Sequence, residues 1–238
     1  MTKISARFAE VIGKLEAHYG TPRNPKTTDA LGLILHENIA YLVTDEKRDA
    51  AFDTLRAEVG LRPQDILSAP LEKLATIARI GGIHPQLRAR RLKEIAQIVL
   101  NDFNGDLLNV FKLPLPEAIK ALKIFPSIAE PGAERILLFT KTYPVLALES
   151  NGLRVLLRLG FGEGRKNYSA SYRSVHEALK DHIGDDCDLL IRAHQLLRQH
   201  GKELCRNNNP ACQICPLNRS CSYFRIQKAG GIRRKPDR

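Results

Sequence analysis

The feature that most constrains this 238-residue chain is a run of four cysteines near its C-terminal end. Cys205, Cys212, Cys215 and Cys221 follow the spacing C-x6-C-x2-C-x5-C within seventeen residues. Four thiolates this close in the chain can enclose a metal centre, which then determines the path of the loop that carries them. The fifth cysteine, Cys187, lies outside the run, and we expect it to be an ordinary helix residue.

Disulfides, zinc and an iron–sulfur cluster are the alternative uses of these four cysteines. Disulfides are typical of small secreted chains, whereas this chain is long enough for a core and shows no apolar leader. We therefore expect no signal peptide and a cytoplasmic, nucleoid-associated or otherwise intracellular protein. Structural zinc usually takes two C-x2-C pairs, and only Cys212 and Cys215 form one. The uneven spacing favours a cubane cluster.

The charge of the chain indicates a polyanionic partner. Lys and Arg number 37 against 26 Asp and Glu, which gives a formal net charge of +11 and a pI near 9.6. The basic residues are dispersed over the chain rather than aligned beside a long apolar face, which favours nucleic acid over a membrane surface. A soluble basic protein with no such partner remains the alternative.

The hydrophobic periodicity predicts a chain that is helical nearly throughout, with only weak strand-like alternation. Thr28 or Asp29 can cap the second predicted helix, and Gly residues end several others. The sequence after Arg225 has little apolar content and reads as a flexible basic tail. The predicted helices cover residues 5–19, 29–43, 46–59, 63–68, 70–79, 85–103, 115–124, 131–142, 151–159, 169–183 and 186–200.

The helical succession, the basic charge and the C-x6-C-x2-C-x5-C ending resemble the endonuclease III and adenine-DNA glycosylase branch of the helix-hairpin-helix DNA glycosylases. That family uses the same spacing for a [4Fe–4S] cluster, preceded by a His-Gly-basic stretch, here His200-Gly201-Lys202. The resemblance covers about residues 5–225. Shorter collinear matches are Val43-Thr44-Asp45, Arg88-Ala89-Arg90 after Gly81-Gly82, and Leu148-Glu149-Ser150 to Arg154-Val155.

The resemblance implies an all-α fold with two domains. Residues 28–143 would form a six-helix barrel with a degenerate helix-hairpin-helix, and residues 1–27 with 144–225 would form the cluster domain, followed by the tail 226–238. A monomer would bind double-stranded DNA in the cleft between the domains, with the target nucleotide flipped out. The residues expected to contact DNA include Arg88, Arg90, Arg206 and Arg219. Ordinary surface charge is the alternative for Arg206 and Arg219.

The hairpin departs from the family pattern. Two family glycines that let backbone N–H groups approach a DNA phosphate are replaced by Ser127 and Ala129, which flank Ile128. A Cβ at a left-handed position costs about 1 kcal/mol, so either the turn changes shape or it is strained. Glu130 adds negative charge beside the expected phosphate. These three residues, Ser127, Ile128 and Ala129, are still expected to meet DNA, but with weaker anchoring.

The catalytic positions of the family differ as well. Pro131 stands where bifunctional members carry the Schiff-base lysine, so lyase chemistry through that residue is excluded; Lys123 or Lys141 could substitute. Glu149 replaces the family's aspartate. It is expected to be a poorer helix cap but can still stabilise an oxocarbenium-like sugar, unless it is only a solvated acid.

Glu37 matches the glutamate with which adenine-DNA glycosylases protonate the base. The spacing of Ala30, Leu33, Ile34, Glu37 and Tyr41 places them on one helix face that should turn inward, and burial would raise the pKa of Glu37. Glu37 would then be a general acid. The alternative is a carboxylate paired with a nearby arginine. Its neighbours His36, Asn38 and Tyr41 could line a base pocket, or they could serve helix packing.

These features together predict a monofunctional DNA glycosylase of base-excision repair, a hydrolase acting on a damaged or mismatched base. Glu37 would protonate the leaving base, Glu149 would stabilise the sugar cation, and water would complete hydrolysis. A non-catalytic DNA lesion-binding protein that keeps the fold and cluster is the alternative. An iron–sulfur redox or sensing protein is a third interpretation.

Overall fold

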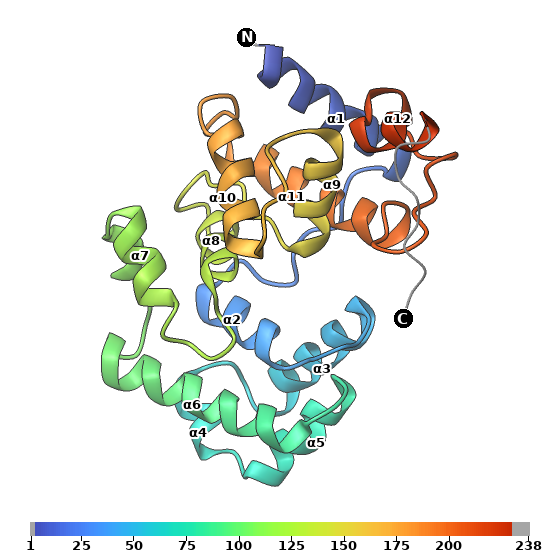
Figure 1. Cartoon of the computed structure of the whole chain (residues 1–238). Helices are drawn as coiled ribbons and strands as arrows, with labels where there is room; N and C mark the ends of the chain where they lie inside the picture. Colours follow the sequence, from blue (N-terminus) through green and yellow to red (C-terminus); the bar gives the residue numbers. More distant parts are fainter. Residues whose placement is uncertain (1–2, 230–238) are drawn as a thin grey trace. The chain divides into compact units, whose positions relative to one another are not determined.

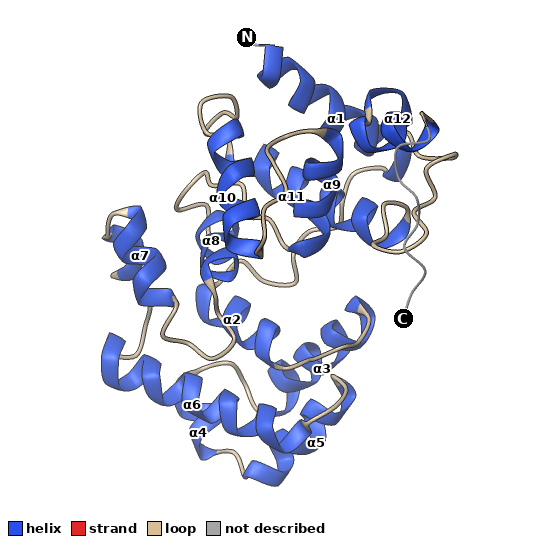
Figure 2. Cartoon of the chain, viewed as in Figure 1, coloured by secondary structure: helices blue, strands red, loops and turns tan. Residues whose placement is uncertain are grey.

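A computed structural model describes residues 3–229, and these residues are helical with connecting loops (Figures 1 and 2). The predicted all-α fold is confirmed. Within the described part of the chain there is no strand, and the one β-bridge joins Tyr41 to Gly82. None of the described helices is long and apolar enough to cross a membrane.

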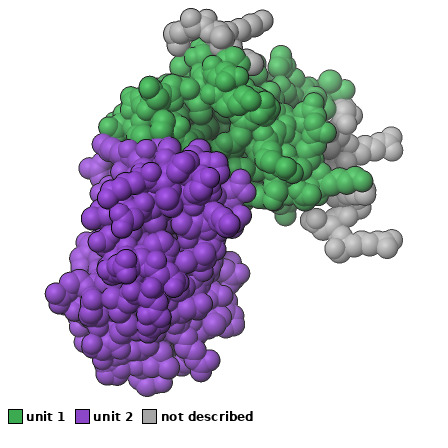
Figure 3. Space-filling view, turned by 90° about the vertical axis from the view of Figure 1, so that its left-hand side faces the viewer, with its two compact units in different colours: residues 1–23, 144–238 green, residues 24–143 purple. Residues whose placement is uncertain are grey.

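The chain divides into two compact units (Figure 3). Residues 24–143 form one, called here the middle unit, and residues 1–23 with 144–238 form the other, the terminal unit. The division falls close to the predicted domain boundaries at residues 27 and 143. The assignment of a barrel to the middle unit and of a cluster to the terminal unit stays a prediction.

The middle unit is built around α6, which packs against α5, α4 and α2. Aliphatic residues on its inner face, such as Leu92, Ile95 and Val99, are fully buried. Burial of such side chains stabilises each by roughly 1.5–3 kcal/mol. The elements are α2 (Ala30–Asn38), α3 (Asp45–Glu58), α4 (Pro63–Ser68), α5 (Leu71–Ile80), α6 (Pro85–Phe103), the 3₁₀ helix η1 (Val110–Lys112), α7 (Leu115–Leu122) and α8 (Glu130–Phe139).

Helix α2 begins where the sequence predicts and ends earlier. Asp29 caps it, because its Oδ2 accepts from the backbone N–H of Gly32 at 2.7 Å. The helix stops at Asn38 instead of Val43, since the backbone N–H of Tyr41 donates to Gly81 O and Leu42 has a left-handed φ of 54°. The prediction that Tyr41 shares a helix face with Glu37 is therefore wrong, and Tyr41 lies 54% exposed on the following loop.

The terminal unit brings the two ends of the chain together. Its N-terminal helix α1 (Lys3–Tyr19) packs on α11 (Cys187–Glu203), and α9 (Ser150–Leu159) packs on α11, α10 (Tyr168–Leu179) and α12 (Ser222–Lys228). A 3₁₀ turn, η2 (Asn218–Ser220), precedes α12.

Helix α12 was not predicted from the sequence. Phe224 is 7% exposed, so the short helix is anchored by an aromatic side chain that the periodicity analysis did not weigh. Residues 226–228 of the predicted tail belong to this helix, and residues 230–238 lie outside the described residues.

Candidate functional site

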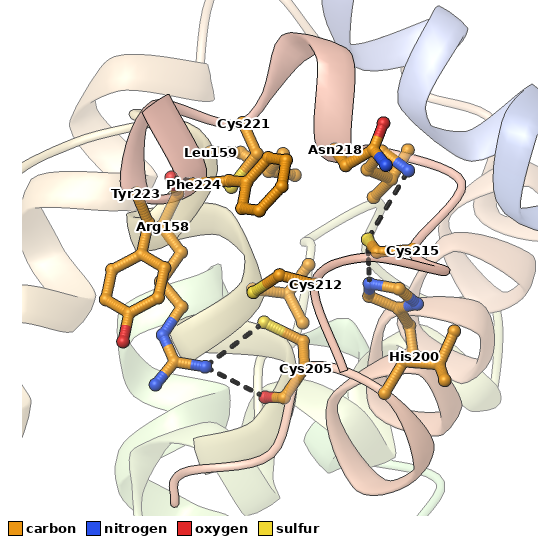
Figure 4. A pocket seen from close by; sticks show the side chains of 13 residues that line it. Arg158, Leu159, His200, Cys205, Cys212, Cys215, Asn218, Cys221, Tyr223 and Phe224 are labelled. Carbon is orange, nitrogen blue, oxygen red and sulfur yellow. Dashed lines mark hydrogen bonds between the residues drawn. The ribbon is translucent and has the colours of Figure 1, made fainter. Parts of the chain in front are cut away.

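The four clustered cysteines line one pocket of the terminal unit (Figure 4). All five cysteines of the chain are free thiols, so the disulfide alternative is not what the structure shows. Burial raises the pKa of the Cys215 thiol to about 11 and raises the pKa of Cys212 above its ordinary value. A metal centre that displaces the thiol protons would offset this cost of ionisation.

The four thiols share the pocket without closing on one point. In the part of the chain that the structure describes, no group of three or more His, Cys, Asp or Glu is arranged to hold a single metal ion. A mononuclear zinc site needs four ligands converging tetrahedrally. Thiols that line a common pocket at wider spacing fit a multi-iron cluster better than one zinc ion.

Arg158, in α9, organises one wall of this pocket. Its guanidinium donates to the backbone oxygens of Arg206 at 2.7 Å and Asn207 at 3.0 Å, and to the sulfur of Cys205 at 3.4 Å. It also stacks 4.5 Å over the ring of Tyr223. The arginine thus holds the start of the cysteine loop and places positive charge beside one thiol.

His200, in α11, forms the opposite wall. Its Nε2 lies 3.5 Å from the sulfur of Cys215 and its Nδ1 lies 3.0 Å from the hydroxyl of Tyr19 in α1. The residue is 1% exposed, and burial, followed by the nearby His18, lowers its pKa to about 4, so the ring is neutral near pH 7.

Glu149 caps α9 with its carboxylate. Oε1 accepts from the backbone N–H of Gly152 at 2.7 Å, and Oε2 accepts from Nδ2 of Asn151 at 2.7 Å. The expectation of a poor cap is wrong, because the longer side chain folds back over the first turn. Its two printed donors are neutral groups, so the negative charge of Glu149 is held in place without a paired cation among them.

A polar chain connects Glu149 to the cysteine loop. Asn151 accepts through Oδ1 from Arg154 Nη2 at 2.7 Å, and Arg154 donates to the backbone oxygens of Gly201 at 2.8 Å and Cys205 at 2.9 Å. Gly201 is required here, since a Cβ would come within 2.6 Å of the Asn151 Cβ. The loop and the candidate carboxylate are therefore held to the same segment of α9.

Glu37 is paired with arginines rather than isolated among apolar neighbours. Arg135 Nη2 donates to its Oε2 at 2.8 Å, and Arg48 Nη1 lies 3.5 Å from the same oxygen and donates to the backbone oxygen of Glu37 at 3.2 Å. Arg135, opposed by burial and assisted by Arg48, lowers the pKa of Glu37. The predicted rise in pKa is wrong, and the arginine-paired alternative describes the contacts.

The three residues predicted to line a base pocket are turned to different neighbours. His36 pairs with Asp49 at 2.8 Å, and burial lowers its pKa despite that partner. Asn38 is 3% exposed and donates to the backbone oxygens of Ile34 at 3.1 Å and Pro126 at 2.9 Å. Asn38 thus ties α2 to the hairpin, and its side chain offers no surface to a base.

The hairpin keeps its left-handed turn without glycine. Ser127 has φ 62°, whereas Ala129 has φ −92°, which any residue adopts. The strain predicted for both substitutions therefore falls on Ser127 alone. Its exposed hydroxyl accepts from Arg91 Nη1 at 3.0 Å, while the side chain of Ile128 is 5% exposed and packs inward. Ile128 could meet DNA only through its backbone.

Pro131 lies in the first turn of α8, where its missing N–H removes no helix hydrogen bond. The first turn of α8 therefore carries no lysine. Of the two substitutes considered, Lys123 is exposed at the C-terminal cap of α7, and Lys141 follows α8 with a left-handed φ of 56°.

Arg88 and Arg90 have opposite surroundings on α6. Arg88 is 2% exposed, and its guanidinium donates to the backbone oxygens of Ala78 at 2.6 Å, Gly81 at 2.7 Å and Gly82 at 2.6 Å. The predicted DNA contact of Arg88 is wrong, because its donors are used in holding the α5–α6 turn. Arg90 is exposed, as are Arg206 and Arg219 in the terminal unit.

The sequence analysis missed an exposed apolar ridge on the middle unit. Leu42 is 76% exposed, Ile83 48% and Leu87 45%, beside Tyr41. The ridge is held by the Tyr41–Gly82 bridge, and a Cβ on Gly81 would come within 2.3 Å of Ile39 O. The Gly81-Gly82 pair was the available signal, since paired glycines often mark a close backbone approach.

Comparison with known proteins agrees with the resemblance found in the sequence. No protein-family model matches the chain. Endonuclease III of Thermotoga maritima is 26% identical over 217 residues, which cover 91% of this chain and 94% of that protein.

Two solved structures share the fold of the chain. A thermostable thymine-DNA glycosylase aligns with a TM-score of 0.74 at 18% identity over 94% of this chain and 99% of its own. A trapped endonuclease III–DNA covalent intermediate aligns with a TM-score of 0.72 at 19% identity over 96% of this chain and all of its own. The predicted helix-hairpin-helix glycosylase fold is confirmed by these alignments.

Proposed function

We propose that this chain, which has the endonuclease III-type helix-hairpin-helix glycosylase fold and relatives of that name, is a DNA glycosylase of base-excision repair. It hydrolyses the N-glycosidic bond of a damaged or mismatched base that is flipped out of double-stranded DNA. The observation that carries the proposal is the carboxylate of Glu149, fixed at the N-terminus of α9 by Gly152 and Asn151.

Glu149 supplies the electrostatic part of the reaction. As the base leaves, positive charge develops on the sugar, and a fixed carboxylate stabilises that charge without having to reorient. Water then adds to the sugar. Because Pro131 occupies the first turn of α8, no lysine from that turn forms a Schiff base, which supports hydrolysis by a monofunctional enzyme.

Glu37 takes a different part from the one its sequence position suggests. A general acid must be protonated, and Arg135 and Arg48 favour the ionised form. In this proposal the ionised carboxylate accepts a hydrogen bond from an N–H group of the base or from water. The enzyme is then best suited to bases that leave without a proton donated by the protein.

Exposed groups on each unit supply the proposed DNA contacts. Arg90 and the hairpin residues Ser127 and Ala129 belong to the middle unit, and Arg206 and Arg219 belong to the terminal unit. Guanidinium groups that neutralise phosphates give a salt-dependent affinity. The apolar ridge at Leu42 resembles the wedges that other proteins insert between base steps to unstack them.

A [4Fe–4S] cluster would be held by Cys205, Cys212, Cys215 and Cys221. The free thiols, their common pocket and the donors beside them support this assignment. When bound, the cluster would act as a structural pin for the loop of residues 206–220, which would present Arg206 and Arg219 to phosphates. Purified protein should contain about four irons and four sulfides per chain.

Base release from a panel of duplexes tests the activity. The panel contains uracil, thymine mismatches, oxidised pyrimidines and adenine mismatches. We expect release of at least one base by the wild type without strand cleavage, and loss of release in Glu149→Gln. Release that is unchanged in Glu149→Gln contradicts the role of Glu149, and strand cleavage with a borohydride-trapped adduct contradicts the monofunctional assignment.

A non-catalytic lesion-binding protein is the second candidate. The arginine pairing of Glu37 and the proline at the lysine position favour it, because both remove groups that would take part in chemistry. Tight binding to abasic or mismatched duplex with no base release across the panel would establish this candidate instead.

A further inference from the structure

A buried hydrogen-bonded chain joins the N-terminal helix to one cysteine of the cluster loop. It runs from the Tyr19 hydroxyl to His200 Nδ1 at 3.0 Å, and from His200 Nε2 to the Cys215 sulfur at 3.5 Å (Figure 4 shows the second contact). His200 is 1% exposed, so bulk water does not compete for either ring nitrogen. Tyr19 and Cys215 are thus connected through one imidazole.

A thiolate at Cys215 determines the proton positions along this chain. A cysteine that ligates iron has lost its proton, so its sulfur can only accept hydrogen bonds. His200 must then carry its proton on Nε2 and donate it toward the sulfur. Its Nδ1 is left as an acceptor, which only the O–H of Tyr19 satisfies as a donor. Tyr19 therefore selects the tautomer.

Cys215 also receives a backbone N–H from Leu217 at 3.4 Å. This donor is present whatever side chain occupies position 200. A second N–H, from a buried side chain, adds positive potential at the sulfur, and hydrogen bonds to cluster sulfurs are among the factors that set reduction potential. The donor from His200 is the part of this environment that substitution can remove.

We propose that His200 is a positioning residue for the cluster, which donates Nε2–H to the Cys215 thiolate in the tautomer that Tyr19 selects. The proposal rests on the cluster assigned above. Loss of this donor lowers the reduction potential, since it stabilises the added negative charge of the reduced state. It also loosens the ligand, because outer partners of metal ligands orient them.

Two variants at position 200 separate the donor from the volume. His200→Leu keeps much of the bulk and removes the donor, whereas His200→Gln keeps an N–H. The measurements are the midpoint potential of the cluster by redox-monitored EPR and the rate of iron loss to a chelator. We expect a lower potential and about tenfold faster iron loss for His200→Leu, and a smaller change for His200→Gln.

Tyr19→Phe tests the tautomer without touching the ring. It should shift the potential in the same direction as His200→Leu, by less, because Nε2–H then competes with the other tautomer. Tyr223→Phe is the matched control: its hydroxyl lies at the same pocket but accepts from Gln227 at 2.7 Å, and its ring stays under Arg158. We expect no shift there.

The outcomes distinguish this inference from the proposed function. Wild type that carries the cluster, with His200→Leu and Tyr19→Phe at the wild-type potential, overturns the role of His200 alone. Should His200→Leu fail to fold, Tyr19→Phe against Tyr223→Phe still decides the matter. Wild type without iron and sulfide overturns both the cluster and this inference.

Discussion

The two candidate carboxylates, one in each unit, have opposite electrostatic surroundings. Glu37 in the middle unit is bound by the guanidinium groups of Arg135 and Arg48, whereas Glu149 in the terminal unit accepts from the neutral N–H groups of Gly152 and Asn151. The charge of Glu37 is used in joining α2 to α3 and α8. The charge of Glu149 stays available to a ligand.

The same contrast holds for other residues that the sequence marks as functional. In the middle unit, Arg88 holds backbone carbonyls and Asn38 holds the hairpin. The comparison teaches that chemistry-bearing residues of the middle unit mainly serve stability. Substitutions there should change folding more than activity, and the reverse should hold at Glu149.

Glu149→Gln should give the largest effect on activity. The amide oxygen can still accept from Gly152, so the cap and the fold persist, while the negative charge beside the developing sugar cation is lost. We expect base release in single-turnover assays to fall about 100-fold, with duplex affinity within a factor of two or so. A parallel fall in thermal stability would show that Glu149 is a cap and no more.

Arg88→Met should give the largest loss of stability. It removes every donor to the backbone oxygens of Ala78, Gly81 and Gly82 at a buried site. We expect the free energy of unfolding in urea to fall by about 3 kcal/mol. The control, Arg90→Met on the exposed side of α6, should leave stability within about 0.5 kcal/mol and lower the salt dependence of DNA binding by about one ion.

Glu37→Gln should lower stability in a pH-dependent way. The pKa of Glu37 in the folded state is depressed below its ordinary value of 4.5, so the ion pairs stabilise the fold above that value. Their contribution is lost as the pH falls through the lower, folded-state pKa. Since 34% of the side chain is exposed, water screens the pairs, and we expect about 1 kcal/mol near pH 7.

Urea unfolding of the wild type and Glu37→Gln between pH 3 and 7, with exposed Glu94→Gln as control, measures this difference. A gap that stays constant through this range would mean that the lost contacts are packing contacts. A gap that widens toward low pH would mean that Glu37 is held protonated, as a general acid would be.

Ser127→Gly should give the smallest effect and a positive one. Relief of the left-handed φ of 62° gains about 1 kcal/mol, and the greater freedom of glycine in the unfolded chain takes back about half of it. Ala129→Gly, at an ordinary φ, should only destabilise, by about 0.5 kcal/mol. Thermal melts of both variants would locate the strain, and equal changes in the two would refute its placement at Ser127.

Local signals predicted most of the helices. The cap at Asp29, the stop at Gly60 and the proline that begins α6 all act on neighbouring residues, and the helices there follow the prediction within one or two positions. Helix α2 was predicted too long because its end depends on the bond from Tyr41 to Gly81, forty residues along the chain. Periodicity cannot detect a contact of that kind.

The sequence by itself determined the all-helical fold, the resemblance to the endonuclease III branch and the grouping of four thiols, because spacing and periodicity are properties of consecutive residues. Only the tertiary structure decided which charged groups are free. Glu37 meets Arg135 across 98 positions and His200 meets Tyr19 across 181. Such partners come together only when helices pack, and their proximity sets the charge and proton positions on which function depends.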